Sequence, residues 1–256
     1  MKPAVALDNV SLCYRLAKAR PPSLKEYALH WVRRQLVYEK LWALRDVTLA
    51  IAPGESVGIV GRNGAGKSTL LKVVSGVLKA TRGRVAAAGR IAPILELGTG
   101  FDPELTGIEN IRLSALFLGH THREIDRAMD AIVEFSGLGG FVRAQARNYS
   151  SGMLARLGFA IVTAWKPDIL IVDEALAVGD AAFLEKCDQR LLEFRRAGTT
   201  LLLVSHQREL VVQNCGRCLW IENGRIAADG PTAEVLSRYA DEGRSVPIEP
   251  ASPPAP

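Results

Sequence analysis

A glycine-rich turn between a short apolar strand and a helix constrains the fold of this chain more than any other feature. Residues 57–71 read V-G-I-V-G-R-N-G-A-G-K-S-T-L-L. Val57 to Val60 predict a buried strand, and the apolar positions after Lys67 predict a helix that continues through Val77 and Leu78. The turn between them fits the pattern G-x-x-x-x-G-K-[S/T]. The stretch therefore predicts a strand–turn–helix unit.

This turn is predicted to bind the phosphates of a nucleoside triphosphate. Glycines let the backbone curl so that successive N–H groups point at phosphate oxygens, and the helix N-terminus adds its own free N–H groups. Lys67 brings a mobile positive charge to the β- and γ-phosphates, and the Ser68 hydroxyl is placed to bind Mg²⁺. A chance match is the alternative, and the flanking strand and helix argue against it. The predicted nucleotide-binding residues here are Gly61, Arg62, Asn63, Gly64, Ala65, Gly66, Lys67, Ser68 and Thr69.

A second set of candidate residues follows another apolar strand. Residues 168–174 read D-I-L-I-V-D-E, so the strand ends in two carboxylates. Asp173 is predicted to hold Mg²⁺ through water. Glu174 is predicted to be the general base that orients and deprotonates the attacking water beside the γ-phosphate. The alternative is a strand end with two solvated acids.

The order of the elements predicts an α/β fold. Strands alternate with helices, which is typical of a parallel sheet covered on both faces. The predicted fold is a P-loop NTPase core with a mostly parallel sheet, an antiparallel β subdomain near the N-terminus and an inserted helical subdomain at 98–165. Expected strands span 4–16, 43–51, 84–97 (two short strands turning at Gly89), 168–174, 199–205, 217–222 and 225–229. Expected helices span 108–118, 123–135, 153–165, 181–197 and 232–241.

The bulk composition favours a cytoplasmic protein. The chain has 256 residues, enough for a sizeable core. It contains no run of 18 apolar residues, and Asp8 and Asn9 interrupt any N-terminal signal core. Four cysteines fit reduced thiols. A proline-rich tail, 243–256, is predicted to be disordered.

Positive charge is concentrated near the N-terminus. Residues 1–45 hold nine Lys/Arg and three Asp/Glu, an excess of six, whereas the net charge of the whole chain is +5. A helix is predicted over 23–38, with Tyr27 and Trp31 on one face. An aromatic, basic helix suits a membrane–water interface, and the alternatives are a solvated face or packing on its own domain. No recognition motif for nucleic acid accompanies the charge, so nucleic acid is not an expected partner.

The ordered set of motifs resembles the ATP-binding subunit of an ABC transporter over about residues 5–240. Y-S-S-G-M at 149–153 is similar to the family signature L-S-G-G-Q, with matches at Ser150 and Gly152. Gly179-Asp180 resembles the D-loop, and His206 falls where the family has its switch histidine. The resemblance implies that Tyr14 stacks on adenine and that His206 is catalytic. It also implies a head-to-tail dimer in which Ser150, Ser151 and Gly152 of one copy cover the ATP of the other.

A narrower resemblance concerns the cargo. The segments I-L-E-L-G-x-G-F-x-P-E-L-T-G, N-Y-S-S-G-M and V-D-E-A-L-A-V-G-D are similar to exporters of O-antigen, capsule and teichoic acid. The family glutamine that reaches Mg²⁺ falls at Glu96, which adds a negative charge beside the γ-phosphate. The resemblance implies one ATPase domain at 1–242, with segment 17–42 as a membrane-proximal insertion. It also implies a permease partner and a location at the cytoplasmic face of the membrane. The alternatives are export of another cargo, such as a lipid or drug, and a soluble ABC ATPase outside transport.

Overall fold

The fold is described by a computed structural model that covers residues 2–17, 38–95, 100–173, 180–205 and 207–245. Several predictions lie outside these residues: most of the helix at 23–38, the tail from 246, and Glu96, Glu174, Gly179 and His206. No helix among the described ranges is both long and apolar enough to cross a bilayer.

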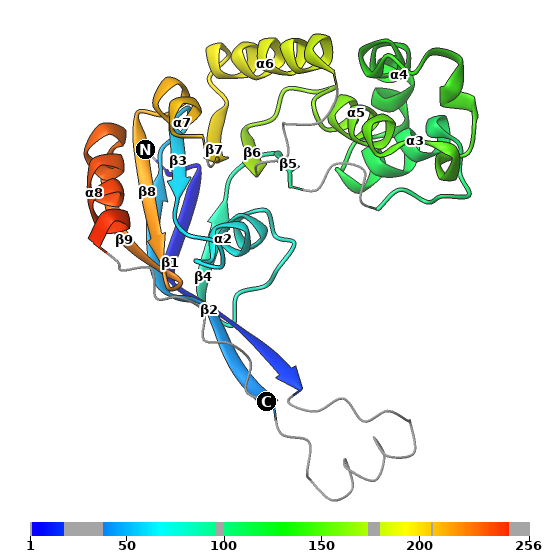
Figure 1. The fold of residues 1–256 in the computed structure, drawn as a ribbon. Coiled ribbons are helices and arrows are strands. Elements are labelled where there is room, and N and C mark those ends of the chain that lie inside the picture. The colour runs from blue at the N-terminus through cyan, green and yellow to red at the C-terminus, as the bar shows by residue number, and fades with distance from the viewer. Residues whose placement is uncertain (1, 18–37, 96–99, 174–179, 206, 246–256) are drawn as a thin grey trace, which may run out of the picture.

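The core is a six-stranded sheet in the order β5-β6-β7-β3-β8-β9 (Figure 1). The first five strands are parallel, and β9 closes one edge as an antiparallel hairpin with β8. The mostly parallel sheet is as predicted. The strands are β3 Ser56–Val60, β5 Ile91–Ile94, β6 Ile169–Asp173, β7 Thr200–Val204, β8 Arg217–Glu222 and β9 Arg225–Pro231.

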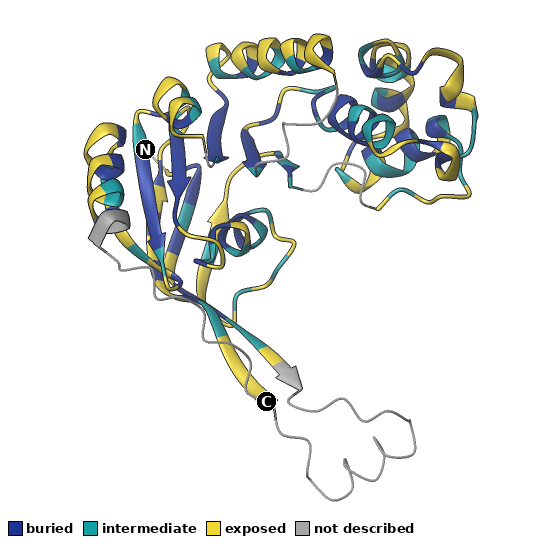
Figure 2. Ribbon diagram, in the orientation of Figure 1, coloured by how far each residue is buried: buried dark blue, intermediate teal, exposed yellow. Residues whose placement is uncertain are grey.

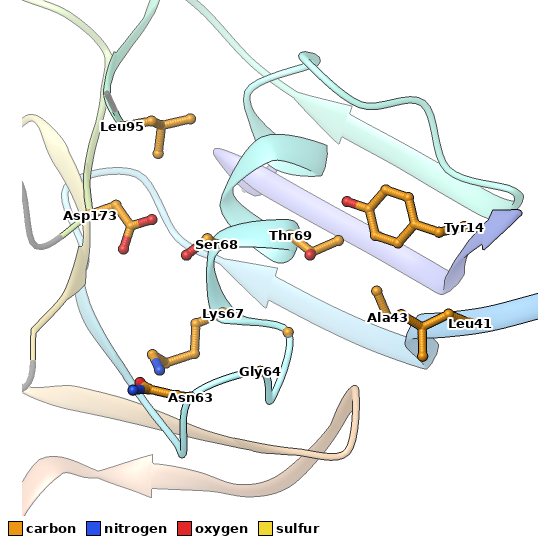
Figure 3. A pocket seen from close by; sticks show the side chains of 11 residues that line it. Tyr14, Leu41, Ala43, Asn63, Gly64, Lys67, Ser68, Thr69, Leu95 and Asp173 are labelled. Atoms are coloured by element: carbon orange, nitrogen blue, oxygen red, sulfur yellow. The ribbon is translucent and has the colours of Figure 1, made fainter. Parts of the chain in front are cut away.

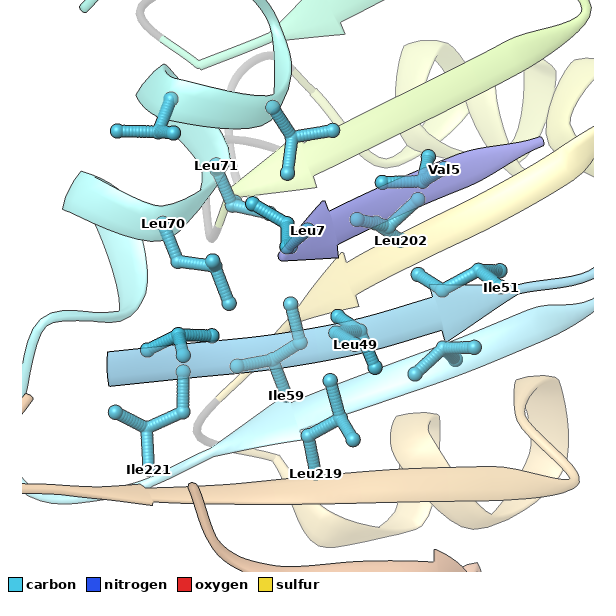
Figure 4. Packing of buried hydrophobic residues seen from close by; sticks show 14 of the residues in the cluster. Val5, Leu7, Leu49, Ile51, Ile59, Leu70, Leu71, Leu202, Leu219 and Ile221 are labelled. Atoms are coloured by element: carbon cyan, nitrogen blue, oxygen red, sulfur yellow. The ribbon is translucent and has the colours of Figure 1, made fainter. Parts of the chain in front are cut away.

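The strands β3, β6, β7 and β8 are buried on both faces: successive side chains point to opposite sides, and other elements cover each side. On β7, Leu202 and Val204 pack toward α2 and the antiparallel sheet, whereas Leu201 and Leu203 pack toward α6, α7 and α8. Figure 4 shows the first of these cores, and Figure 2 shows the dark, buried central strands. The covering helices are α2 Lys67–Val74, α6 Ala181–Arg196, α7 Arg208–Asn214 and α8 Thr232–Ser245.

Two helices differ in length from the predictions. α2 ends at Val74 rather than continuing to Leu78, because Ser75 caps it and Gly76 turns the chain with φ 78°. α8 runs to Ser245, so residues 243–245 of the predicted tail are helical.

The predicted antiparallel subdomain is a three-stranded sheet in the order β2-β1-β4. Its strands are β1 Val5–Ala17, β2 Tyr38–Ile51 and β4 Arg82–Ala87. β2 begins five residues before the predicted start at Ala43, so Tyr38 is in a strand and not at the end of a helix. Residues 38–42 pair with 13–17 and extend the two strands as a long arm away from the body (Figure 1). The two short strands around Gly89 do not pair with each other: β4 joins β1, and β5 joins β6.

The predicted helical subdomain lies beside the sheet with a core of its own (Figure 1). Its elements are α3 Gly107–Phe117, α4 His122–Ser136, η1 Gly139–Arg143, η2 Ala146–Asn148 and α5 Ser151–Val162. α5 ends three residues before the predicted Trp165. There the Thr163 hydroxyl donates to the Phe159 carbonyl at 2.7 Å, and the backbone of Thr163 leaves the helical region.

A capping box at the start of α4 joins the helical subdomain to the core. The Glu124 carboxylate accepts hydrogen bonds from the backbone N–H and the hydroxyl of Thr121, both at 2.8 Å, and pairs with Arg90 at 3.5 Å. The hydrogen bonds from Thr121, with a smaller contribution from Arg90, lower the pKa of Glu124 from 4.5 to about 2. The ionised carboxylate is therefore the form that the fold stabilises.

Glu124→Gln is expected to lower the melting temperature at pH 7 by a few degrees. Because the folded-state pKa is depressed, this stabilisation is complete above the unfolded pKa near 4.5 and is lost as the pH falls toward 2. Melting curves of the two proteins should therefore converge over this range. Glu134→Gln, an exposed glutamate on the same helix, is the matched control. A difference for Glu124→Gln that does not change between pH 7 and pH 2 would contradict this account.

Candidate functional site

The phosphate loop is wrapped around the side chain of Lys67. This lysine is the first residue of α2 and is only 7% exposed. Its Nζ donates to the carbonyl oxygens of Gly61 at 2.9 Å and Arg62 at 3.2 Å. A buried ammonium must be hydrogen-bonded, so these contacts stabilise the curl of the loop. The positive charge is thereby held against the Gly61–Arg62 part of the loop.

Glycine is required at two points of this loop because its backbone has positive φ and no space for a side chain. At Gly66 φ is 110°, and a Cβ would lie 2.6 Å from the Ala43 carbonyl oxygen. At Gly61 φ is 153°, and a Cβ would collide with the Ile221 carbonyl. The loop is therefore enclosed between β2 and β8.

The turn between β8 and β9 contacts the phosphate loop. This contact was not predicted from the sequence. The Gly224 N–H donates to the Ala65 carbonyl at 2.9 Å, and the Arg45 N–H donates to the Gly224 carbonyl at 2.8 Å. An Asn-Gly pair between two strands favours a hairpin, and Asn223-Gly224 connects β8 and β9 in this way. Nothing local in the sequence signals that its turn packs against a loop about 160 residues earlier in the chain.

An open cavity of about 640 Å³ lies over the loop (Figure 3). It brings together eight predicted residues from three elements: Tyr14 of β1, the loop and first turn of α2, and Asp173 at the end of β6. Leu41, Ala43 and Leu95 also line it and were not predicted. The predicted residues that line this cavity are Tyr14, Asn63, Gly64, Gly66, Lys67, Ser68, Thr69 and Asp173. Arg62 and Ala65 instead line a smaller cavity of about 200 Å³ on the side of the β8–β9 turn, together with Asn63 and Gly64.

The residues present suit a magnesium ion. In Figure 3 the Ser68 hydroxyl and the Asp173 carboxylate extend from α2 and β6 toward the same part of the cavity. Oxygen ligands are what Mg²⁺ prefers, and it commonly keeps waters and phosphate oxygens for its other positions. No cluster of three His, Cys, Asp or Glu side chains occurs in the described parts of the chain. Two side chains with substrate and water are sufficient for this ion.

The remaining predicted catalytic residues follow strands of the central sheet in the sequence. Glu174 comes directly after Asp173, and His206 comes directly after Ser205 at the end of β7. Neither these two residues nor Glu96 is among the described residues, so they stay predictions.

The signature segment starts helix α5 and does not line the cavity. The Ser150 side chain caps the helix and accepts from the Met153 N–H at 3.2 Å. Tyr149, where the family has leucine, is buried, and its hydroxyl donates to the Phe141 carbonyl at 2.8 Å. Burial raises the pKa of the Tyr149 hydroxyl. This tyrosine packs in the core of the helical subdomain. It therefore fixes the position of the chain directly before Ser150, Ser151 and Gly152.

Asp180, the described residue of the predicted D-loop, is tied to the helical subdomain. Its carboxylate caps α6 by accepting from the Phe183 N–H at 2.9 Å, and it pairs with Arg156 of α5 at 3.3 Å. The Arg156 guanidinium also lies 5.0 Å from the centre of the Phe183 ring. These contacts link the helix of the signature segment to the helix that follows the D-loop.

Comparison with known proteins finds relatives in the family that the sequence motifs resemble. A family model described as ABC transporter matches residues 44–177. The O-antigen export system ATP-binding protein RfbB of Klebsiella pneumoniae is 45% identical over 93% of this chain and 98% of its own length. The teichoic acids export ATP-binding protein TagH of Lactococcus lactis is 46% identical over 77% of this chain, and the match spans 42% of TagH.

Solved structures share the fold at low sequence identity. An ATP-binding subunit of an ABC transporter superposes with a TM-score of 0.72 at 23% identity and covers 93% of both chains. A dimeric ATP-binding cassette bound to ADP and Pi superposes with a TM-score of 0.69 at 22% identity, covering 89% of this chain and 98% of the cassette.

Proposed function

This chain belongs to the ABC transporter family, and we propose that it is the ATP-hydrolysing subunit of an exporter of lipid-linked polysaccharide of the O-antigen or capsule type. The observation that carries this proposal is the 45% identity to an O-antigen export ATP-binding protein over 98% of that protein. The similarity to a teichoic acids export protein supports the same class of cargo, a polymer of the cell surface.

The chemistry we propose is hydrolysis of the γ-phosphate bond of ATP with Mg²⁺. The loop N–H groups and Lys67 bind the phosphates, and the charge of Lys67 stabilises the negative charge of the transition state. Ser68, Asp173 and Glu96 would hold Mg²⁺, which would neutralise phosphate charge. Glu174 accepts the proton of the attacking water, and His206 contacts the γ-phosphate. Tyr14, which lines the cavity away from the Asp173 end, stacks on adenine.

A complete site needs a second copy of the chain. Ser150, Ser151 and Gly152 do not line the cavity of their own chain, although they begin a helix whose N-terminus favours anions. We propose that these residues cover the ATP held by the phosphate loop of the partner, in a two-fold head-to-tail dimer. The similarity to a dimeric cassette supports this arrangement.

The remaining partner in this proposal is a membrane permease. The helical subdomain carries two strongly exposed aromatic side chains, Phe117 at 83% and Phe141 at 67% exposure. Aromatic side chains are enriched at protein interfaces, so these two phenylalanines are proposed contacts for the permease. Together with the basic segment 17–42, they support a position at the cytoplasmic face of the membrane, where the subdomain passes motion to the permease.

Deletion of the gene in the source organism tests the cargo. Surface polysaccharide should be lost while lipid-linked polysaccharide accumulates inside the cell, and wild type but not Glu174→Gln should restore export. Export of a different lipid or of a drug predicts unchanged surface polysaccharide. A soluble ABC ATPase predicts, in addition, that no membrane protein copurifies with the chain.

A further inference from the structure

The long arm formed by β1 and β2 brings an unpredicted apolar side chain to the cavity. Tyr14 of β1 and Leu41 of β2 are direct cross-strand partners, and both line the cavity beside the phosphate loop. Partners in an antiparallel pair share one face of the sheet. Figure 3 shows the two side chains, with Ala43, at the end of the cavity opposite Asp173.

A bulge in β2 shapes this end of the cavity. Leu12 pairs with Leu44 and Cys13 with Trp42, so Ala43 is an extra residue without a partner in the ladder. Bulges redirect neighbouring side chains and are frequent beside functional sites. Trp42 points to the other face, where the Arg82 guanidinium lies 5.3 Å from the centre of its ring. This contact links β2 to β4 across β1.

Leu41 is unusually exposed for its size. More than half of it, 53%, is accessible to solvent, although it lies on the cavity side of a paired strand. Covering an apolar side chain in this position with a flat apolar surface is favourable, because it removes the side chain from water. Tyr14, Leu41 and Ala43 offer one polar side-chain atom between them, the Tyr14 hydroxyl, so a ligand here is bound by its faces rather than by its polar edges.

We propose that Leu41 is a second nucleobase-binding residue, which packs against the base that stacks on Tyr14, so that the arm is part of the nucleotide site. The inference rests on the proposed ATP-binding function. The ligand chemistry is a planar purine ring, whose faces are apolar and whose edges carry the polar atoms. Leu41 reaches this position only because residues 38–42 continue β2 along β1.

The test separates the base from the phosphates. Binding of Mg·ATP and of magnesium tripolyphosphate, which has the phosphate chain without a base, is measured by isothermal titration calorimetry. Leu41→Ala is expected to weaken ATP binding about five- to tenfold and to leave tripolyphosphate binding unchanged. Leu41→Met, which conserves volume, should retain wild-type affinity for both. Val77→Ala, an apolar residue that is 61% exposed and does not line the cavity, is the matched control.

Each outcome decides the inference. Unchanged ATP affinity in Leu41→Ala would overturn it, and so would an equal loss for ATP and tripolyphosphate, since that pattern reports a displaced phosphate loop. Failure of the wild-type chain to bind ATP at all would overturn the proposed function itself. A selective loss for ATP that Leu41→Met repairs would support the role of Leu41.

Discussion

Glu174→Gln is expected to reduce ATP turnover about 10²–10⁴-fold while ATP still binds, because the change removes only the proposed general base. Glutamine keeps the size and polarity of the side chain but does not take up the proton of the attacking water. Asp173, Ser68 and Lys67, which line the nucleotide cavity, stay in place. Turnover is measured as phosphate release, and binding as ATP affinity at equilibrium.

The same variant should also accumulate a dimer. If two copies enclose two ATP molecules, blocked hydrolysis leaves the closed dimer intact, and size-exclusion chromatography with Mg·ATP should show twice the monomer mass. Glu185→Gln, an exposed glutamate on α6, is the control and should behave as wild type. Normal turnover in Glu174→Gln would show that another group is the base.

Lys67→Ala is expected to weaken ATP binding roughly 10- to 150-fold. A hydrogen bond to a charged group contributes about 1.5–3 kcal/mol, and each 1.4 kcal/mol changes affinity tenfold. The substitution also removes the ammonium that holds the Gly61 and Arg62 carbonyls, so the loop loses its internal support. Calorimetric titration with Mg·ATP measures the loss, and hydrolysis at fixed ATP should fall with it.

The control for charge alone is Lys79→Ala. Lys79 is exposed and lies beyond the end of α2, so its removal changes the net charge equally without changing the loop. Melting curves without nucleotide confirm that both variants are folded. If Lys67→Ala binds ATP as tightly as Lys79→Ala does, the affinity for ATP does not depend on Lys67.

Local motifs carried the prediction of the phosphate loop. Gly61, Gly66 and Lys67 lie within seven residues of one another, and their conformations follow from steric rules that act over that distance. The strand before and the helix after were predicted from their apolar residues, which is also a local pattern. Asp173 was predicted beside the loop because it ends an apolar strand that delivers two carboxylates, and it lines the same cavity.

Of the elements that differ from the predictions, α2 does so through a local turn and β2 through a long-range pairing. α2 was predicted too long because Val77 and Leu78 continue its apolar pattern, whereas Gly76 turns the chain before them. β2 was predicted too short because the predicted aromatic helix was extended to Tyr38 and the strand was started only at Ala43. Pairing with β1 makes residues 38–42 a strand. A pattern of side chains does not specify the partner that completes its hydrogen bonds.

Sequence patterns alone were enough to assign the α/β class, the phosphate loop, the inserted helical subdomain and the ABC transporter family, because each rests on residues that act locally or in a fixed order. Only the folded chain decided that the β8–β9 turn supports the loop and that Leu41 faces the same cavity as Tyr14. Both depend on strand register and sheet order, which arise when segments distant in the chain exclude water from a shared core.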